Sequence, residues 1–376
     1  MDFEYDHYLR NSWIQRVMKR LLFLFAICLS SCSGRSSTEG YCALSDIVYV
    51  PRLEISVSLG EGTRMDHVDC SGALDILATR NHLLFSGAST KTVMSVDKSS
   101  GEKTGGFLNR GRGPGEVLYA EYFMSRPLRV KDEREQLGYQ DSYQLWQWAD
   151  LEESLIKGSP EIVETQRIPE DFKTVFPKTS LEDGLFWGIR LKDMAIGYER
   201  SLQNDSGSKE IPQNLSLLNK AAIQTEQDGV LVNVLSVLYG YNRWCGRMVE
   251  ASLYLNTIHI YDLDGAFAKT ICLGRRLTNY LSVEKRFKAL GYSEETFLIL
   301  KMYKDFFAVL QGDGKSVCLF DMNGEFLQVF HLPYKATTFD FDVFTGLLYT
   351  LNSEKEEIRF YETGRYGKYL MSGERF

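Results

Sequence analysis

One pattern limits the fold of this chain more than any other: short apolar strands separated by tight turns recur as units of the same order. Each unit reads strand, turn, strand, Asp-rich turn, strand. The clearest copies cover residues 83–107, 252–273, 306–332 and 347–364. In such turns Asp hydrogen-bonds to its own backbone and Gly accepts a positive φ. The repetition predicts an all-β protein built from similar units.

Two weaker copies, at residues 143–150 and 185–210, fill the middle of the chain. The turns then recur every 40 to 60 residues or so, roughly the blade length of a propeller with loop insertions. The sequence therefore predicts a six-bladed β-propeller. Residues 46–60 contain further strands, which we expect to complete the last blade and close the ring. A β-sandwich followed by a second domain is the alternative, and the regular units argue against it.

Short helical inserts are expected at residues 214–227 and 282–290, where apolar residues follow helical spacing. Ser282 is a candidate N-cap and Gly291 a candidate C-cap for the second insert. The composition agrees with a globular β protein, since 44% of residues are hydrophobic and 13% are aromatic. The net charge of −7 argues against a nucleic-acid partner.

The N-terminal region carries an export signal. Lys19 and Arg20 precede an apolar stretch, LLFLFAICLS, that is too short to span a bilayer as a permanent helix. It ends in Leu29-Ser30-Ser31-Cys32, which resembles the lipobox of bacterial lipoproteins. The resemblance implies that Cys32 is acylated and becomes the N-terminus, which anchors the protein to a membrane. The alternative is an ordinary signal peptide, or a buried core helix, in which Cys32 is incidental.

A glycine-rich loop follows the strand that ends near Leu108. It reads Arg110-Gly111-Arg112-Gly113-Pro114-Gly115-Glu116. Successive N–H groups in such a backbone can face an anion beside Arg110 and Arg112. The alternative is a structural loop between blades, in which the Arg and Glu side chains pair with neighbouring residues. We list Arg110, Arg112 and Glu116 as candidate ligand-binding residues.

The stretch GRGPGE, in a chain with a lipobox and propeller repeats, resembles the TolB-like six-bladed propeller lipoproteins of Bacteroidetes. Residues 258–265 are similar to the blades of NHL-type propellers. This resemblance implies an envelope lipoprotein with no established catalytic residues.

We divide the chain into a signal peptide at 1–31, an acylated Cys with a flexible tether at 32–42, and a propeller at 43–376. Residues 1–17 are unlike a signal sequence, and Met18 is an alternative start. The tether lacks the acidic run that resembles surface-export signals of Bacteroidetes lipoproteins. We therefore expect a lipid-anchored protein of the bacterial cell envelope that faces the periplasm.

Other candidate sites come from aromatic residues and cysteines. Trp146 and Trp148 alternate along one strand, so both point to one face, where they suit sugar or peptide binding; packing in a blade core is the alternative. Cys272 and Cys318 lie in apolar strands and are expected as buried thiols. A disulfide between Cys42 and Cys70 is possible in an oxidising compartment. No histidine spacing predicts a zinc site.

These observations favour an envelope-anchored, non-catalytic propeller that acts as a binding or scaffold module and needs no cofactor. Its expected partners are the membrane, through the lipid anchor, and envelope proteins, peptides or glycans. The alternative is a metal-dependent propeller hydrolase or lactonase of the calcium type, whose ligands would converge from several blades. We predict no catalytic or metal-binding residue from the sequence.

Overall fold

The computed structural model describes residues 47–364 apart from short gaps at 88–90, 114–115, 118–126, 142–144, 169–177, 181–184, 193–196, 205–206, 210–223, 228–229, 234–235, 264–265 and 291–292. These residues belong to one compact unit, 40–376. The signal peptide, Cys32 and the tether lie outside the described residues. Within the described part, no helix is both long and apolar enough to cross a bilayer.

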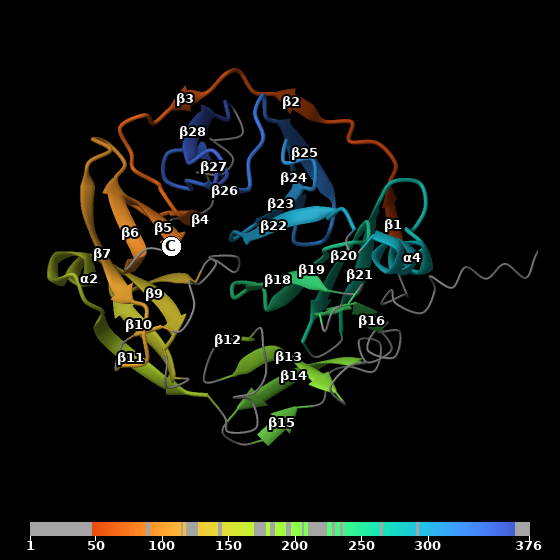
Figure 1. Cartoon of the computed structure of the whole chain (residues 1–376), viewed down its shortest axis with the longest axis horizontal. Helices are drawn as coiled ribbons and strands as arrows, with labels where there is room; N and C mark the ends of the chain where they lie inside the picture. The colour runs from red at the N-terminus through yellow and green to blue at the C-terminus, as the bar shows by residue number, and fades with distance from the viewer. Residues whose placement is uncertain are drawn as a thin grey trace, which may run out of the picture. The chain divides into compact units, whose positions relative to one another are not determined.

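The chain folds into a β-propeller, in which antiparallel sheets follow one another around a centre (Figure 1). Five sheets, or blades, are described with their side chains. They are β4 (Ala73–Ala78), β5 (His82–Gly87), β6 (Lys91–Asp97) and β7 (Lys103–Asn109); β8 (Leu128–Lys131), β9 (Arg134–Gln140), β10 (Leu145–Asp150) and β11 (Glu161–Arg167); β18 (Val237–Asn242), β19 (Arg247–Ser252), β20 (Thr257–Asp262) and β21 (Ala268–Leu273); β22 (Phe297–Met302), β23 (Phe306–Gln311), β24 (Ser316–Asp321) and β25 (Phe326–His331); β26 (Thr338–Phe341), β27 (Leu347–Asn352) and β28 (Glu357–Glu362).

A further sheet is described mainly by its backbone. It contains β12 (Lys178–Ser180), β13 (Phe186–Lys192), β14 (Gly197–Asn204) and β15 (Gly207–Lys209), and a hairpin follows it, β16 (Gln224–Gln227) and β17 (Val230–Asn233). The predicted all-β propeller is thus confirmed, with five blades described in full. The predicted count of six depends on this β12–β15 sheet, in whose strands the packing is described only at Phe186 and Trp187.

Apolar clusters fill the spaces between neighbouring blades. The largest joins β18–β21 to β22–β25, and another joins β22–β25 to β26–β28. A third cluster joins β26–β28 to β4–β7, and a fourth joins β4–β7 to β8–β11. Because β4 alternates, Ile76 and Ala78 face one neighbouring blade while Leu77 faces the other. The period-2 pattern of the sequence therefore supplies both interfaces of a blade.

Three N-terminal strands run along the outside of the ring (Figure 1). They are β1 (Ile47–Val50), β2 (Ser56–Ser58) and β3 (Thr63–Arg64). The expectation that residues 46–60 complete the last blade is wrong. β1 pairs in parallel with β21, and β2 pairs in parallel with β25, so each adds a fifth strand to a blade that is already complete. β3 lies beyond the predicted segment, and it is β3 that pairs with β28 and gives the last blade its fourth strand.

Some local predictions also need correction. Residues 253–255, which we expected to form the first strand of the unit at 252–273, form bends instead. The strand lies just before them and is β19. The helix α4 (Tyr280–Leu290) exists as predicted, but it begins before Ser282, whose hydroxyl donates to the Asn279 carbonyl at 2.6 Å from inside the helix. Gly291 lies outside the described residues. Of the other expected helix, residues 214–223 are not described and residues 224–227 form β16.

A short helix that the sequence analysis did not predict, α2 (Leu151–Lys157), follows β10. The Asp150 side chain caps it by accepting the Glu153 N–H at 3.0 Å, and Gly158 ends it with a φ of 65°. α2 packs against β7 of the preceding blade, where a side chain on Gly105 would meet the Leu155 carbonyl. It therefore connects the first two blades.

Buried charges join the inner strands of three blades near the ring centre. The Lys301 ammonium on β22 donates to both carboxylate oxygens of Asp75 on β4 at 2.9 Å, and both side chains are fully buried. Thr338 of β26 also donates to Asp75. The Asp340 carboxylate accepts the Ala78 N–H at 2.8 Å and the Tyr303 hydroxyl at 2.7 Å. These contacts tie the first blade to the last two.

Candidate ligand-binding cavity between the first two blades

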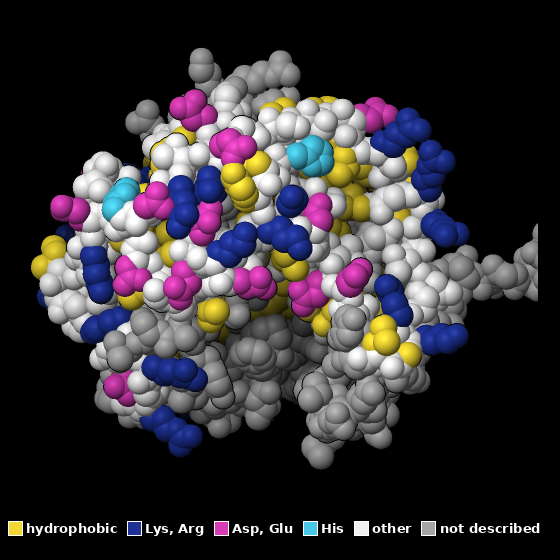
Figure 2. Space-filling view, turned by 45° about the horizontal axis from the view of Figure 1, so that its top comes forward, with side chains coloured by type: hydrophobic (Ala, Val, Ile, Leu, Met, Phe, Trp, Pro, Cys, Tyr) yellow, Lys and Arg dark blue, Asp and Glu magenta, His cyan; other side chains and the backbone are white. Residues whose placement is uncertain are grey.

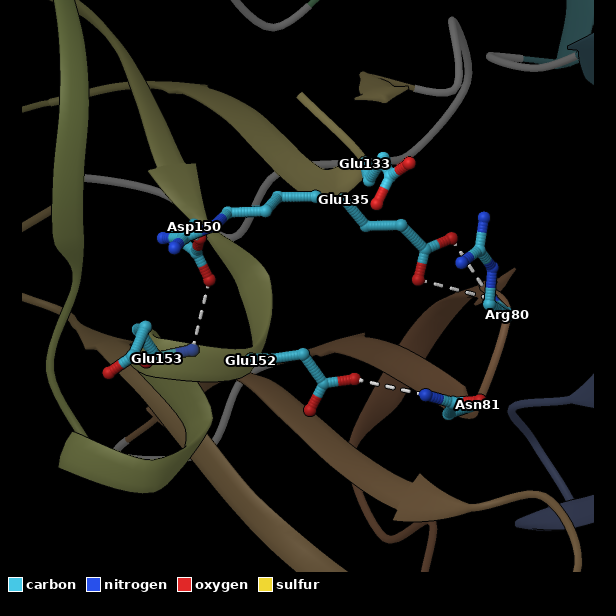
Figure 3. A pocket seen from close by; sticks show the side chains of 8 residues that line it. Arg80, Asn81, Glu133, Glu135, Asp150, Glu152 and Glu153 are labelled. Atoms are coloured by element: carbon cyan, nitrogen blue, oxygen red, sulfur yellow. Dashed lines mark hydrogen bonds and ion pairs between the residues drawn. The ribbon is translucent and has the colours of Figure 1, made fainter. Parts of the chain in front are cut away.

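A cavity of about 310 Å³ opens where blades β4–β7 and β8–β11 meet (Figure 3). It is rich in charged side chains. Its lining residues are Arg80, Asn81, Glu133, Arg134, Glu135, Asp150, Glu152 and Glu153. Five of these are carboxylates and two are guanidinium groups, so the lining has a surplus of negative charge.

Tight turns present the residues on two sides of the cavity. Arg80 and Asn81 form the turn between β4 and β5, which is closed by backbone and hydroxyl contacts between Thr79 and His82. Glu133 lies in the turn between β8 and β9, with φ of 64°, directly after Asp132 with φ of 52°. Lys131 pairs with Arg134, so Asp132 and Glu133 are the two central residues of a tight hairpin turn, which requires a positive φ at both.

Glu135 on β9 is one of two buried carboxylates of the lining, with 8% of its surface exposed, and the other is Asp150. Both of its oxygens accept the Arg80 N–H, at 2.9 and 3.2 Å. Burial raises the pKa of Glu135, and this bond only partly offsets the effect of burial. The charges of Arg80 and Lys98 favour the ionised form as well, and a further positive charge in the cavity would stabilise it more.

The helix α2 supplies the remaining wall. The Glu152 carboxylate lies 3.1 Å from His82 Nε2 and accepts the Asn81 amide at 3.3 Å. Asp150 is the N-cap of α2 and also accepts Arg134 at 3.3 Å. Figure 3 shows Glu152 pointing towards Asn81, and Asp150 towards the Glu153 backbone. The N-cap and first turn of α2 therefore determine where these carboxylates lie.

The arrangement suits an organic cation. An ammonium or guanidinium group can donate to several carboxylates at once, and charge-assisted bonds of this kind are stronger than neutral ones. Among the residues that the structure describes, no group of three or more His, Cys, Asp or Glu side chains is arranged to hold a metal ion. The calcium alternative from the sequence stays a prediction.

The glycine-rich loop lies elsewhere, after β7. The Gly113 N–H donates to the carboxylate of Glu116 at 2.6 Å, so an anion of the chain itself occupies this position. A side chain on Gly111 would also collide with Glu116. Arg110 and Arg112 are exposed, and Pro114 and Gly115 lie outside the described residues. A ligand-binding role for Arg110, Arg112 and Glu116 stays a prediction.

Trp146 and Trp148 point to the same face, as the alternation indicated. Both are core residues, each 4% exposed, and they cluster with Ile168 and Phe186. The two rings meet edge to face at 6.2 Å, and Arg129 covers the Trp148 ring at 4.0 Å. Their faces are therefore not presented at the surface, and their burial gives no support to ligand binding by Trp146 and Trp148.

The described cysteines are free thiols. Cys272 and Cys318 are buried in strands, as expected, and burial raises the pKa of Cys318 to about 12. Cys70 is buried and free, and Cys42 lies outside the described residues. Cys32 also lies outside them, so its acylation stays a prediction.

Sequence reasoning did not identify the cavity. Glu152 and Glu153 look like solvated residues of a loop or cap in the sequence, and Asp150 looks like a turn. One signal was present: Asp150 followed three residues later by Glu153 is the pattern of a helix N-terminus. That pattern predicts α2, but it does not show which blade α2 contacts.

No protein-family model matches this chain, and no curated protein is similar to it in sequence. Among solved structures, the chain is similar to a DUF4221 family member from Bacteroides vulgatus, with 12% identity over 81% of this chain and 94% of the other, and a TM-score of 0.49. It is also similar to regucalcin, a calcium-binding protein of Agrobacterium tumefaciens, with 9% identity, coverage of 83% and 96%, and a TM-score of 0.43. At these values the similarity carries no inference about function.

Proposed function

We propose that this protein is a lipid-anchored binding module of the bacterial cell envelope, without catalytic activity, and that the cavity between the first two blades is its ligand site. The lipobox supports the anchor. The propeller supports the binding role, because its rigid sheets hold loops at fixed positions.

The ligand class follows from the lining of the cavity. Five carboxylates, including the buried Glu135, face one space with two guanidinium groups, of which Arg134 is already paired with Asp150. We propose that the cavity accepts a cationic group, such as a Lys or Arg side chain of a peptide. This agrees with the peptide partners expected from the sequence.

Titration with short peptides tests the ligand class. Trilysine and triarginine should bind to the purified protein in calorimetry, whereas triglutamate should not. The double variant Glu133→Gln, Glu152→Gln should bind trilysine about 10-fold more weakly or worse, because two charge-assisted contacts are lost. Its thermal stability should stay close to that of the wild type, because exposed ion pairs contribute little.

The matched control is Glu354→Gln, an exposed carboxylate outside the cavity. It should leave the affinity for trilysine unchanged. Equal affinity of the double variant and the wild type would contradict the proposed ligand site, and so would equal binding of triglutamate and trilysine.

The anchor has its own test. Mass spectrometry of the protein from cells should find a mature N-terminus at Cys32 that carries acyl chains. An unmodified Cys32, or a chain that retains Met1 or Met18, would contradict the anchor and leave the ligand site untouched.

We also infer that β12–β15 is a sixth blade, which would agree with the resemblance to TolB-like lipoproteins. Two contacts support this inference. Phe186 of β13 packs with Trp146 and Trp148 of the preceding blade, and Trp187 lies 4.2 Å from Tyr239 of the following one. Trp187→Ala should therefore destabilise the protein by about 3 to 5 kcal/mol. Wild-type stability of this variant would count against a sixth blade.

A further inference from the structure

A group of cations lies beside the first described strand of the chain. The segments 47–55 and 274–290 together contain six Lys or Arg and only two Glu, although the whole chain has a net charge of −7. We call this region the basic edge. Five of its cations are exposed: Arg52, Arg275, Arg276, Lys285 and Arg286.

Backbone contacts bring the two segments of the basic edge together. β1 pairs with β21 up to Val50 and Leu273, and the Val50 carbonyl accepts the Gly274 N–H at 2.9 Å. Arg52 therefore follows one strand at the point where Arg275 and Arg276 follow the other. Asn256 holds this loop by donating to the Leu273 carbonyl at 2.8 Å and the Arg276 carbonyl at 3.0 Å.

The helix α4 adds Lys285 and Arg286 to the same edge. Its buried residues Val283 and Phe287 fix the helix, and Phe287 packs edge to face on Tyr254. None of the five exposed cations forms an ion pair with a described residue. Figure 2 shows Lys and Arg gathering along the right-hand edge of the molecule, whereas both signs are mixed over the rest of that face.

Exposed apolar side chains accompany these cations. Tyr49 of β1 is 47% exposed, Ile55 is 48% exposed, and Leu290 at the end of α4 is 59% exposed. Surfaces that combine cations with exposed aromatic and aliphatic side chains are typical of proteins that lie on anionic bilayers.

We propose that the basic edge contacts a membrane surface of anionic phospholipid. Charge complementarity is the first argument. The second is the length of the chain outside the structure, because residues 33–46 reach at most about 50 Å between Cys32 and Ile47, and β1 is where they meet the propeller. This inference rests on the proposed anchor for its biological setting, but the surface is a property of the propeller alone.

Vesicle sedimentation tests the proposal without the anchor. The experiment uses residues 33–376 without acyl groups, because residues 40–376 form one compact unit. This protein should sediment with vesicles that contain phosphatidylglycerol and not with pure phosphatidylcholine vesicles. Raising the salt should release it. The variant Arg275→Glu, Arg276→Glu, Lys285→Glu should bind about 100-fold more weakly, at roughly fivefold per cation.

The matched control reverses three exposed lysines elsewhere, Lys103, Lys315 and Lys355, with the same change in net charge. It should lower binding much less, and circular dichroism should show that both variants are folded. The proposal is overturned if the wild type does not bind anionic vesicles, or if the two variants lose binding equally. An unmodified Cys32 would contradict the anchor but would leave the vesicle result as it is.

Discussion

The first blade, β4–β7, uses charge in opposite ways on its two sides. Towards the last blades, Asp75 is fully buried and meets Lys301 and Thr338. Towards the second blade, Glu135 is almost as buried, but both of its oxygens accept the same backbone N–H, that of Arg80, and more carboxylates surround it. On one side the buried carboxylates are held by a cation or by several donors, and on the other negative charge is in excess.

The apolar packing of the two sides does not explain this difference. Each interface has a cluster of twelve buried apolar residues, so the hydrophobic contribution to holding the blades is similar. The difference lies in the polar groups. Matched buried charges fix one arrangement of blades, whereas unmatched carboxylates beside a cavity leave charge available for a ligand.

The largest effect is expected from a substitution of Asp75. Asp75→Ala leaves the Lys301 ammonium buried without its counter-ion, so we expect the free energy of unfolding to fall by about 3 to 5 kcal/mol. Chemical denaturation measures this change. A loss below about 1 kcal/mol would mean that the ion pair does not hold the ring closed.

A second variant separates the missing partner from the missing charge. Asp75→Ala combined with Lys301→Met removes both charges, and should recover a large part of the lost stability because no buried ion remains unpaired. A double variant that is less stable than Asp75→Ala would contradict this account.

At the other interface, the expected effect is on binding. The pKa of Glu135 is raised, so its contribution to stability is greatest at low pH and declines as pH rises through its folded value. A cationic ligand favours the ionised form. Trilysine affinity should therefore rise with pH across the titration of Glu135, and Glu135→Gln should bind about 10-fold more weakly with a flat profile. If the affinity of the variant for trilysine has the same pH dependence as that of the wild type, Glu135 does not contribute to the binding of this ligand.

The sequence predicted the propeller because period-2 alternation and Asp-Gly turns are local signals. Asp321-Met322-Asn323-Gly324 turns as expected, and Gly324 has a φ of 84° between β24 and β25. The residues that we predicted to close the ring, 46–60, are not the ones that complete the last blade. β1, β2 and β3 all read as short strands, and which blade each one joins depends on contacts with residues more than 200 positions away.

The cavity was unpredictable for the same reason. Arg80, Glu135 and Glu152 come from a turn, a strand and a helix, and each is unremarkable in its own segment. Trp146 and Trp148 illustrate the reverse case. Alternation correctly placed both on one face, but alternation alone does not tell an interface between blades from a face in solvent.

The smallest expected effect concerns Glu164 on β11, which is the last strand of the second blade. Its carboxylate accepts Arg129 at 2.6 Å and Lys131 at 3.1 Å, and the Arg129 bond is the main reason why its pKa falls to about 2. A lowered pKa stabilises the fold above the unfolded value, near 4.5, and this stabilisation is lost as the pH falls towards 2. The Glu164 side chain is 30% exposed, so we expect its contribution to the free energy of unfolding to be below about 1 kcal/mol.

Urea denaturation between pH 5 and about 2.5 measures this contribution. The free energy of unfolding should fall less steeply with acid in Glu164→Gln than in the wild type. Parallel pH curves would mean that matched charges on this outer strand, unlike those at Asp75, contribute nothing to the fold.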